Sequence, residues 1–387
     1  MLVEDIFIEL VSFSICGTSE RNSYKLKNNA ELFEDAYSLA VKHDLGHLVG
    51  KALSILGSPE SDVIKKSRTA ILQAIFRYER MNCEFEKICE ILESANIPHI
   101  PLKGAILRTY YPEEWMRTSS DIDILVREDN LDEAVAILKY KLKYTGSRKS
   151  DHDFSLYSPN GIHLELHYDT VEKRYANDCS RTVLMQIWDR SFLQQGKNYC
   201  RCLTDEMFYF YYIAHTAKHF ETGGSGVRSI LDIWVMNHRI EYDRDARENL
   251  LKQGGLLKFA RALEQLSEAW FSGELPSDKT DQLSKYILKG GVYGNTENRA
   301  TLGQAKMGGR IKYILLRRVF MPYEYLKAEY PVLNKHVWLF PFCQVVRWIR
   351  MIQSGAMSRH IGEILSNIKV RKENREAVFE MLQELEL

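Results

Sequence analysis

Apolar residues recur at helical spacing through the first part of the chain. After Ser61 they lie three or four positions apart over a long stretch, which places them on one face of a helix. Serine is also a residue type that commonly caps a helix N-terminus. We therefore expect residues 1–95 to be helical, with one face of the longest helix buried. The apolar positions of that face are Ile71, Ala74, Ile75, Tyr78, Met81, Phe85, Ile88 and Leu92.

The pattern changes to mixed helix and strand after this region. The run IPHIPLKG is short and apolar, and its two prolines restrict it to a short or edge strand. A short helix is expected in AILRTYY, a strand in DIDILV and a helix from Asn130. The runs FSLYS and IHLELHY flank Asn160-Gly161, and Asn-Gly between alternating segments predicts a β-hairpin. The expected order is strand, helix, strand, helix, strand, strand.

Helical patterns return from about Thr204, in runs such as MFYFYYIAHTAKHF and LLKFARALEQLSEAWF. We expect an α+β fold with an N-terminal helical region at 1–95, an α/β core at 96–202 and a C-terminal helical region at 203–387. The core should be a mixed sheet flanked by helices and wrapped by both helical regions. The run HVWLFPFCQVVRWIRMI is interrupted by proline and arginine, which predicts a half-buried helix and no membrane span.

Composition limits the classes of partner. Of 387 residues, 45% are hydrophobic and 27% are charged, as in ordinary globular proteins. Lys plus Arg equals Asp plus Glu at 52 each, so the chain has no overall positive field, which argues against a long nucleic acid as partner. The odd number of cysteines, seven, favours reduced thiols. With acidic residues near its start in place of a signal peptide, the chain is expected to be cytoplasmic.

Carboxylates occupy one side of two expected strands. Residues two apart in a strand point the same way, so Asp121 and Asp123 project together. In IHLELH the same rule places His163, Glu165 and His167 on one side and the apolar residues on the other. Three carboxylates brought together repel one another unless a cation joins them, so their convergence predicts a divalent metal with oxygen ligands.

A D-x-D pattern alone has several interpretations. Alternating acids are common on surface strands, so the motif by itself is as compatible with a solvated strand as with a site. Haloacid-dehalogenase-type phosphatases place the first Asp after a buried apolar strand, whereas Asp121 follows the polar run MRTSS. Glycosyltransferases with D-x-D normally begin with a doubly wound nucleotide domain, whereas the first 95 residues here have helical patterns. Both alternatives fit the chain less well.

The stretch LKGAILRTYYPEEWMRTSSDIDILV, followed by a helix and HLELH, resembles the DNA-polymerase-β-like nucleotidyltransferase pattern. More closely, the chain resembles the uncharacterised bacterial nucleotidyltransferase family of that superfamily, sharply over residues 98–170. The resemblance implies that Asp121, Asp123 and Glu165 are catalytic ligands of Mg²⁺ (or Mn²⁺), with an NTP as substrate. Two departures stand out. The first turn is Gly104-Ala105 where the superfamily usually has Gly-Ser or Gly-Gly, and the third acid is Glu where Asp is common.

The same turn supplies candidate nucleotide-binding residues. Backbone N–H groups of Gly104 and Ala105 at a helix start favour a phosphate oxygen. Lys103 is expected to add a point charge at the phosphates and Arg117 a planar fork, and Ser120 lies beside the first Asp. The alternative for the lysine and the arginine is that they are solvated surface charges.

The helical half offers a second group of polar residues. His215, Lys218 and His219 share a helix face, and Arg228 follows on the next helix, four residues before Asp232. We expect the first four to border the same cleft as the acids, with the lysine and Arg228 contacting phosphate and an ion pair between Arg228 and Asp232. The alternative is a buried polar seam with an ordinary salt bridge. The candidates for acceptor binding or proton transfer are His167, His215 and His219.

Three functions remain open. The first is an enzyme that moves a nucleoside monophosphate from an NTP to a small-molecule or protein acceptor. The second is a catalytically silent nucleotide-binding or regulatory module with the same fold. The third is a helical interaction protein whose acids are surface residues. Retention of all three acids favours the enzyme.

Overall fold

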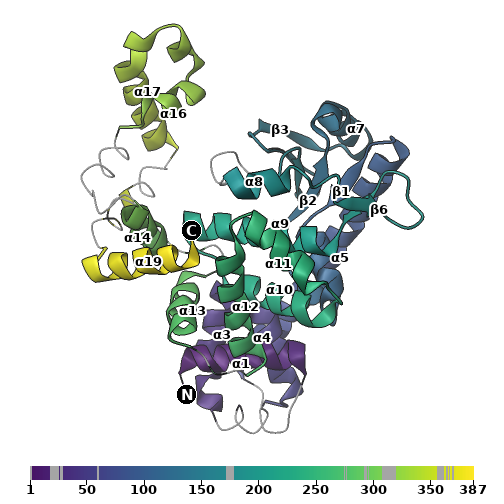
Figure 1. The fold of residues 1–387 in the computed structure, drawn as a ribbon, viewed down its shortest axis with the longest axis vertical. Coiled ribbons are helices and arrows are strands. Elements are labelled where there is room, and N and C mark those ends of the chain that lie inside the picture. The colour runs from purple at the N-terminus through teal and green to yellow at the C-terminus, as the bar shows by residue number, and fades with distance from the viewer. Residues whose placement is uncertain are drawn as a thin grey trace.

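The computed structural model describes residues 2–17, 26, 29–58, 61–170, 178–273, 275, 277–291, 294, 296–306, 320–354, 361–362, 365, 367 and 370–387. A small sheet with its own helices lies on one side of a larger helical assembly (Figure 1). The fold class is therefore mixed α+β, as the sequence predicted. The helices are α1 (Val3–Cys16), α3 (Phe33–Lys42), α4 (Gly46–Ile55), α5 (Asp62–Ser94), α6 (Gly104–Leu107), α7 (Leu131–Leu142), α8 (Asp178–Leu184), α9 (Asp205–Thr222), α10 (Val227–Arg239), α11 (Arg244–Gln253), α12 (Leu257–Phe271), α13 (Asp278–Gly290), α14 (Thr296–Lys306), α16 (Tyr323–Glu329), α17 (Phe340–Gln353) and α19 (Lys372–Leu385).

The long helix α5 begins where its sequence indicates. The hydroxyl of Ser61 accepts a hydrogen bond from the backbone N–H of Ile64 at 3.4 Å, which caps the helix. The expected apolar face is confirmed, because Ala74, Met81 and Ile88 are buried. The first half of α5 packs against α4, and its second half packs against the sheet and α7. The helix therefore connects the helical assembly to the sheet.

Five strands form the main sheet, in the order β1-β2-β5-β4-β3. The pair β2/β5 is parallel, and the other three neighbouring pairs are antiparallel. The two runs flanking Asn160-Gly161 pair as β4 and β5, as predicted. The sequence pattern missed β3, because its residues TGSRK lack the apolar alternation of a strand. The strands are β1 (His99–Pro101), β2 (Asp121–Val126), β3 (Thr145–Lys149), β4 (Asp153–Tyr157) and β5 (His163–His167).

One face of this sheet is apolar and the other is polar. Ile122, Ile124, Leu164 and Leu166 pack with α5 and α7 in a core of their own. The residues between them in sequence point the opposite way, as the two-residue period of a strand requires. Because α5 and α7 cover the apolar face, the polar face is left directed toward α9 and α10, whose residues share a cavity with it.

A second, two-stranded sheet was not predicted. It pairs β6 (Ser191–Leu193) with β7 (Arg201–Leu203), and its turn is held by Glu93 at the end of α5. The Glu93 carboxylate accepts backbone N–H hydrogen bonds from Asn198, Tyr199 and Cys200 at 2.6–3.3 Å. Both strands are three residues long, and unlike β1, which lies in the apolar run IPHIPL, neither belongs to a longer apolar run that a sequence pattern could detect.

Helices from both ends of the chain share the largest hydrophobic core. Residues of α1, α3 and α4 pack together with residues of α9, α10, α12 and α13. Phe7, Tyr209, Phe210, Phe220 and Phe259 are among the largest side chains fully enclosed there. This core supports α9 and α10, the two helices that face the sheet.

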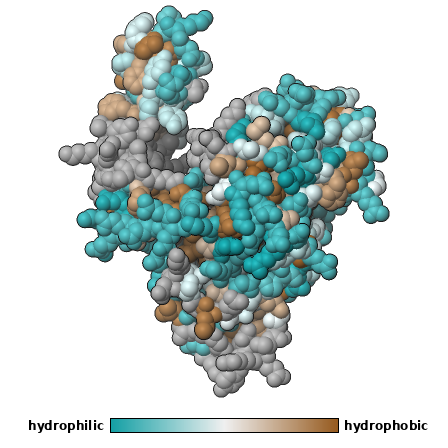
Figure 2. Space-filling view, in the orientation of Figure 1, coloured by the Kyte–Doolittle hydropathy of each residue, from teal (hydrophilic) through white to brown (hydrophobic). Residues whose placement is uncertain are grey.

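The helices α16 and α17 lie apart from the other labelled elements (Figure 1). They form a small cluster around Leu326, Leu333 and Cys343, so the expected helix near 340–352 is present but packs on α16. Its opposite side exposes Phe342 and Ile352. Figure 2 shows hydrophobic residues on this unit, above a mostly hydrophilic body. Within the described residues, no helix combines the length and apolar character that crossing a membrane requires.

Candidate active site

The acids meet on the polar face of the sheet because of the strand register. In the parallel pair β2/β5, Asp121 lies opposite His163 and Asp123 lies opposite Glu165. One ligand atom each from Asp121, His163 and Glu165 lies within 4.8 Å of the other two, and so does one each from Asp123, Glu165 and His167. Glu165 belongs to both groups. The structure therefore brings together the three acids that the sequence singled out.

The adjoining strand β4 extends this face. Because β4 is antiparallel to β5, Asp153, Ser155 and Tyr157 lie opposite His167, Glu165 and His163. The Tyr157 ring stacks on His163 with a centroid separation of 4.7 Å. Sequence reasoning missed these three β4 residues. The signal was present, because they alternate along the strand before the Asn-Gly turn, so pairing through that turn places them beside Glu165.

Asp123 is the most enclosed of the three acids, with 4% of its surface exposed. Its Oδ1 accepts hydrogen bonds from Lys103 Nζ at 2.7 Å and from His167 Nε2 at 2.8 Å. Burial alone raises the pKa of Asp123, but Lys103 and His167 outweigh it and hold that pKa below its ordinary value. Burial lowers the pKa of Lys103, and Asp123 more than reverses this, so its pKa is well above normal. The pair is therefore ionised.

Asp121 and Glu165 have opposite tendencies. Burial and the neighbouring Asp123 raise the pKa of Asp121. Burial also acts to raise the pKa of Glu165, but the hydrogen bond from His167 lowers it overall. Asp121 has no salt bridge of its own among the residues that the structure describes, so its charge is the least compensated of the three. Carboxylates in this condition favour an added cation.

The turn before α6 has an unusual backbone. Lys103 has φ 43° and ψ −114°, in a region that residues with a side chain rarely adopt. This conformation ends β1 and turns the chain so that the Lys103 ammonium reaches β2, where it contacts Asp123. Strained backbone of this kind is frequent at functional sites.

The opposite wall of the site is formed by α9 and α10. His215 and His219 are one helical turn apart, and their Nε2 atoms lie 2.9 Å from each other. Burial, followed by the charge of Lys103, lowers the pKa of His215 well below normal and that of His219 to about 4. The two imidazoles are therefore neutral near pH 7, and one Nε2–H donates to the other. Positive charge on this wall comes from Lys218 and Arg228, which also line the cavity.

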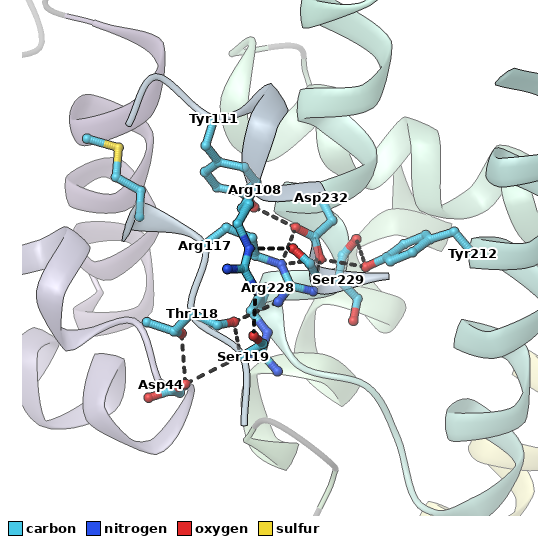
Figure 3. A network of polar contacts seen from close by, with 12 residues as sticks. Asp44, Arg108, Tyr111, Arg117, Thr118, Ser119, Tyr212, Arg228, Ser229 and Asp232 are labelled. Carbon is cyan, nitrogen blue, oxygen red and sulfur yellow. Dashed lines mark hydrogen bonds and ion pairs between the residues drawn. The ribbon is translucent and has the colours of Figure 1, made fainter. Parts of the chain in front are cut away.

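The expected ion pair between Arg228 and Asp232 is wrong. Arg228 Nη1 lies 3.3 Å from Asp44 Oδ2 and donates to the Thr118 carbonyl oxygen at 3.2 Å. Asp232 instead receives Arg117, through contacts of 2.9, 3.1 and 2.9 Å (Figure 3). The reason is burial. Asp232 is 1% exposed, so its charge needs a partner that is buried with it, and Arg117 is that partner. The i,i+4 spacing used for the prediction applies to pairs on the exposed surface of a helix.

This pairing also changes the expectation for Arg117. The guanidinium uses Nε and Nη2 on Asp232 and Nη1 on the Thr118 carbonyl oxygen at 2.6 Å. Arg117 is buried, so it is not the solvated surface charge considered above. Because its N–H groups are used on Asp232 and Thr118, it is also not a planar donor left available for a phosphate. Tyr111 and Tyr212 donate their hydroxyls to the same carboxylate at 2.6 and 2.8 Å. Arg117 therefore anchors the segment that leads into β2 to helix α10.

These walls enclose a cavity of about 570 Å³. Of the residues singled out from the sequence, Ala105 is not among those that line it within the described chain. The others line it: Lys103, Gly104, Arg117, Ser120, Asp121, Asp123, His163, Glu165, His167, His215, Lys218, His219 and Arg228. Besides the β4 residues, sequence reasoning did not assign the following lining residues to the cavity: Ser119, Ser150, Asp151, His152, Thr170, Tyr212, Thr216, Ser225, Ser229 and Asp232, of which Asp232 was expected only as an ion-pair partner. All of these lie in loops or on helices, where no strand period predicts their direction.

Fold and site together define an α+β protein in which acids on a sheet face cationic side chains on helices across a polar cavity. The chain belongs to a family described as uncharacterised nucleotidyltransferase, whose model matches residues 29–272. The matched range contains the main sheet and the helices α9 and α10. Comparisons with curated proteins and with solved structures find no match. Membership of the family supports a transferase with a nucleotide substrate.

Proposed function

We propose that this protein transfers a nucleoside monophosphate from an NTP to a hydroxyl of a small-molecule or protein acceptor. We also propose that its sheet is a polymerase-β-like core, with residues 96–202 as the unit that carries the chemistry. The observation that supports this most is the β2/β5 register, which sets Asp123 beside Glu165 and Asp121 on the same face.

The donor set fits a divalent cation that prefers oxygen. Asp121, Asp123 and Glu165 offer carboxylate oxygens, and the ligand atoms of each candidate group lie within 4.8 Å of one another. In this proposal the three acids hold Mg²⁺ or Mn²⁺. Such an ion, when bound, supplies positive charge that polarises the phosphoryl group and stabilises the leaving pyrophosphate.

The cationic residues hold the triphosphate in this proposal. Lys103 lies at the acids, while Lys218 and Arg228 line the helical wall opposite them, so a polyanion in the cavity meets positive charge on both sides. The acceptor oxygen forms a bond to the α-phosphorus, the bond to the bridging oxygen breaks, and pyrophosphate leaves. The neutral His215–His219 pair is the first candidate to take the proton that the acceptor hydroxyl releases.

One observation favours the second candidate, a catalytically silent nucleotide-binding module. Lys103 and His167 both donate to the same oxygen of Asp123, so part of the charge that a metal ion requires is already neutralised by the protein. In a silent module NTP binds but no label is transferred. The chain has 52 acidic and 52 basic residues, and this balanced charge argues against a long nucleic acid as the partner in either function.

The test is transfer of label. Purified protein is incubated with each α-labelled NTP, Mg²⁺ or Mn²⁺ and a cell extract, and the labelled product is isolated. Asp121→Asn and Asp123→Asn are expected to abolish transfer while the circular dichroism spectrum stays that of the parent. Asp132→Asn, on the exposed first turn of α7, is the matched control. Transfer at the parent rate by both site variants would show that the proposed mechanism is wrong.

A further inference from the structure

Ser119 packs closely against Gly104, the first residue of α6. A Cβ atom added to Gly104 would lie 3.1 Å from Ser119 Cβ and 3.3 Å from its Oγ, so the absence of a side chain at Gly104 leaves the room that Ser119 needs. Ser119 is buried but lines the cavity. Neither Gly104 nor Ala105 carries a hydroxyl, so Ser119 supplies the hydroxyl group at this point of the cavity wall.

A buried arginine lies behind this hydroxyl. Arg108 is 3% exposed and does not line the cavity. Figure 3 shows Arg108 beside Ser119, and its Nη2 donates to Ser119 Oγ at 3.3 Å. Its Nε donates to the Gly104 carbonyl oxygen at 3.0 Å, while Nη1 has no hydrogen-bond partner in the part of the chain that the structure describes. Among the described residues Arg108 forms no ion pair, in contrast to Arg117, which is paired with Asp232. The guanidinium lies 5.7 Å from the centroid of the Tyr78 ring, and Glu114 adds some negative charge, but neither forms an ion pair with it. A buried cation without an ion pair is costly, and an anion nearby would offset part of that cost.

The direction of these hydrogen bonds fixes what Ser119 can offer. Its Oγ accepts from Arg108, so its own proton remains to be donated, and within the described part of the chain no group accepts it. The positive charge behind the hydroxyl makes it a stronger donor toward an anion. We propose that Ser119 binds a phosphate oxygen of the nucleotide through its hydroxyl, and that Arg108 is the positioning residue that orients it. This inference rests on the proposed function, because it assigns a contact to the same substrate.

The first experiment measures binding of two probes, an NTP and inorganic tripolyphosphate, at fixed Mg²⁺. Ser119→Ala is expected to weaken both by a similar factor of about 10, as for loss of a hydrogen bond to a charged group. Ser119→Thr keeps the hydroxyl and should bind closer to the parent. Ser267→Ala removes a buried hydroxyl that donates within α12, far from the cavity lining, and serves as the control.

A double-mutant cycle tests the role of Arg108. Arg108→Lys keeps the charge but loses the donor to Ser119, so it should weaken tripolyphosphate binding in the parent and have little further effect in the Ser119→Ala background. A purely structural role would give additive effects. Binding of both probes by Ser119→Ala within about twofold of the parent, or loss of NTP affinity alone, would overturn the inference. If the parent binds neither probe, the proposed function itself fails and the inference falls with it.

Discussion

Replacing Asp232 by asparagine should destabilise the protein more than any other single charge change at the site. The carboxylate is 1% exposed and receives the Arg117 guanidinium together with the hydroxyls of Tyr111 and Tyr212. Asparagine has nearly the same shape but is neutral, and its amide group can accept through only one atom. Arg117, which is 9% exposed, would then be a buried cation with no counter-charge.

The magnitude follows from burial. Removing one partner of a buried ion pair costs about 3–5 kcal/mol, a large part of the roughly 5–15 kcal/mol that stabilises a typical protein. The matched control is Asp44→Asn, because Asp44 also pairs with arginines, Arg228 at 3.3 Å and Arg77 at 3.4 Å, but its side chain is 38% exposed. Exposed pairs contribute about 0–1 kcal/mol, so the control should unfold close to the parent.

The assay is unfolding in urea, followed by circular dichroism and tryptophan fluorescence. The free energies of unfolding are compared between proteins that have the same dependence of that free energy on urea concentration. Asp232→Asn should unfold at a much lower urea concentration than either the parent or Asp44→Asn. A free energy of unfolding within about 1 kcal/mol of the parent would show that the Arg117–Asp232 pair is not the buried, fully desolvated contact described above.

Three further predictions concern the cavity, pH and packing. Lys218→Met and Arg228→Gln should each weaken NTP binding by about 10-fold at fixed Mg²⁺ in calorimetry, and unchanged binding in both would assign these residues to structure. Burial lowers the pKa of His43 to about 4 in the folded protein, whereas in the unfolded chain it keeps its ordinary value near 6.5. Between these pH values the unfolded chain binds a proton that the folded chain does not. Stability should therefore fall as pH drops from about 6.5 to 4. His43→Gln should make that fall less steep, with the remainder coming from other buried histidines such as His215 and His219, and an unchanged slope in acid titrations would contradict this. Gly50→Ala places a Cβ 2.8 Å from a side-chain atom of α5 and should cost about 1–3 kcal/mol in thermal unfolding, whereas Gly303→Ala, with nothing within 4 Å, should cost nothing.

The sequence predicted the acidic face well because strand geometry leaves little freedom. A period of two determines that Asp121 and Asp123 share a face, and the Asn-Gly turn determines that the strand carrying Glu165 pairs with its predecessor. What the sequence could not determine was which strand lies next to β2. The parallel β2/β5 pairing, which brings Glu165 to Asp123, depends on the chain crossing between them through α7, β3 and β4.

Partners on the helical side were less predictable because tertiary contacts decide them. Arg228 and Asp232 have the spacing of a helical ion pair, yet each pairs with a residue more than a hundred positions away. A buried carboxylate selects the donor set that satisfies all its lone pairs, and spacing on one helix contributes only a few tenths of a kcal/mol, about 0.2–0.5. Likewise β3 lacks a hydrophobic pattern, because an edge strand needs little buried surface.

The histidines show why burial has to be weighed before charge is assigned from residue type. His215 and His219 occupy the wall opposite the acids, where the sequence alone suggested a basic helix face. Because they are buried and Lys103 already supplies positive charge nearby, protonating either ring would add a second cation to a poorly solvated region. They therefore remain neutral and keep a ring nitrogen able to accept a proton. In the function proposed above, Lys103, Lys218 and Arg228 bind the triphosphate while an unprotonated imidazole stays beside it to accept the proton of the acceptor hydroxyl.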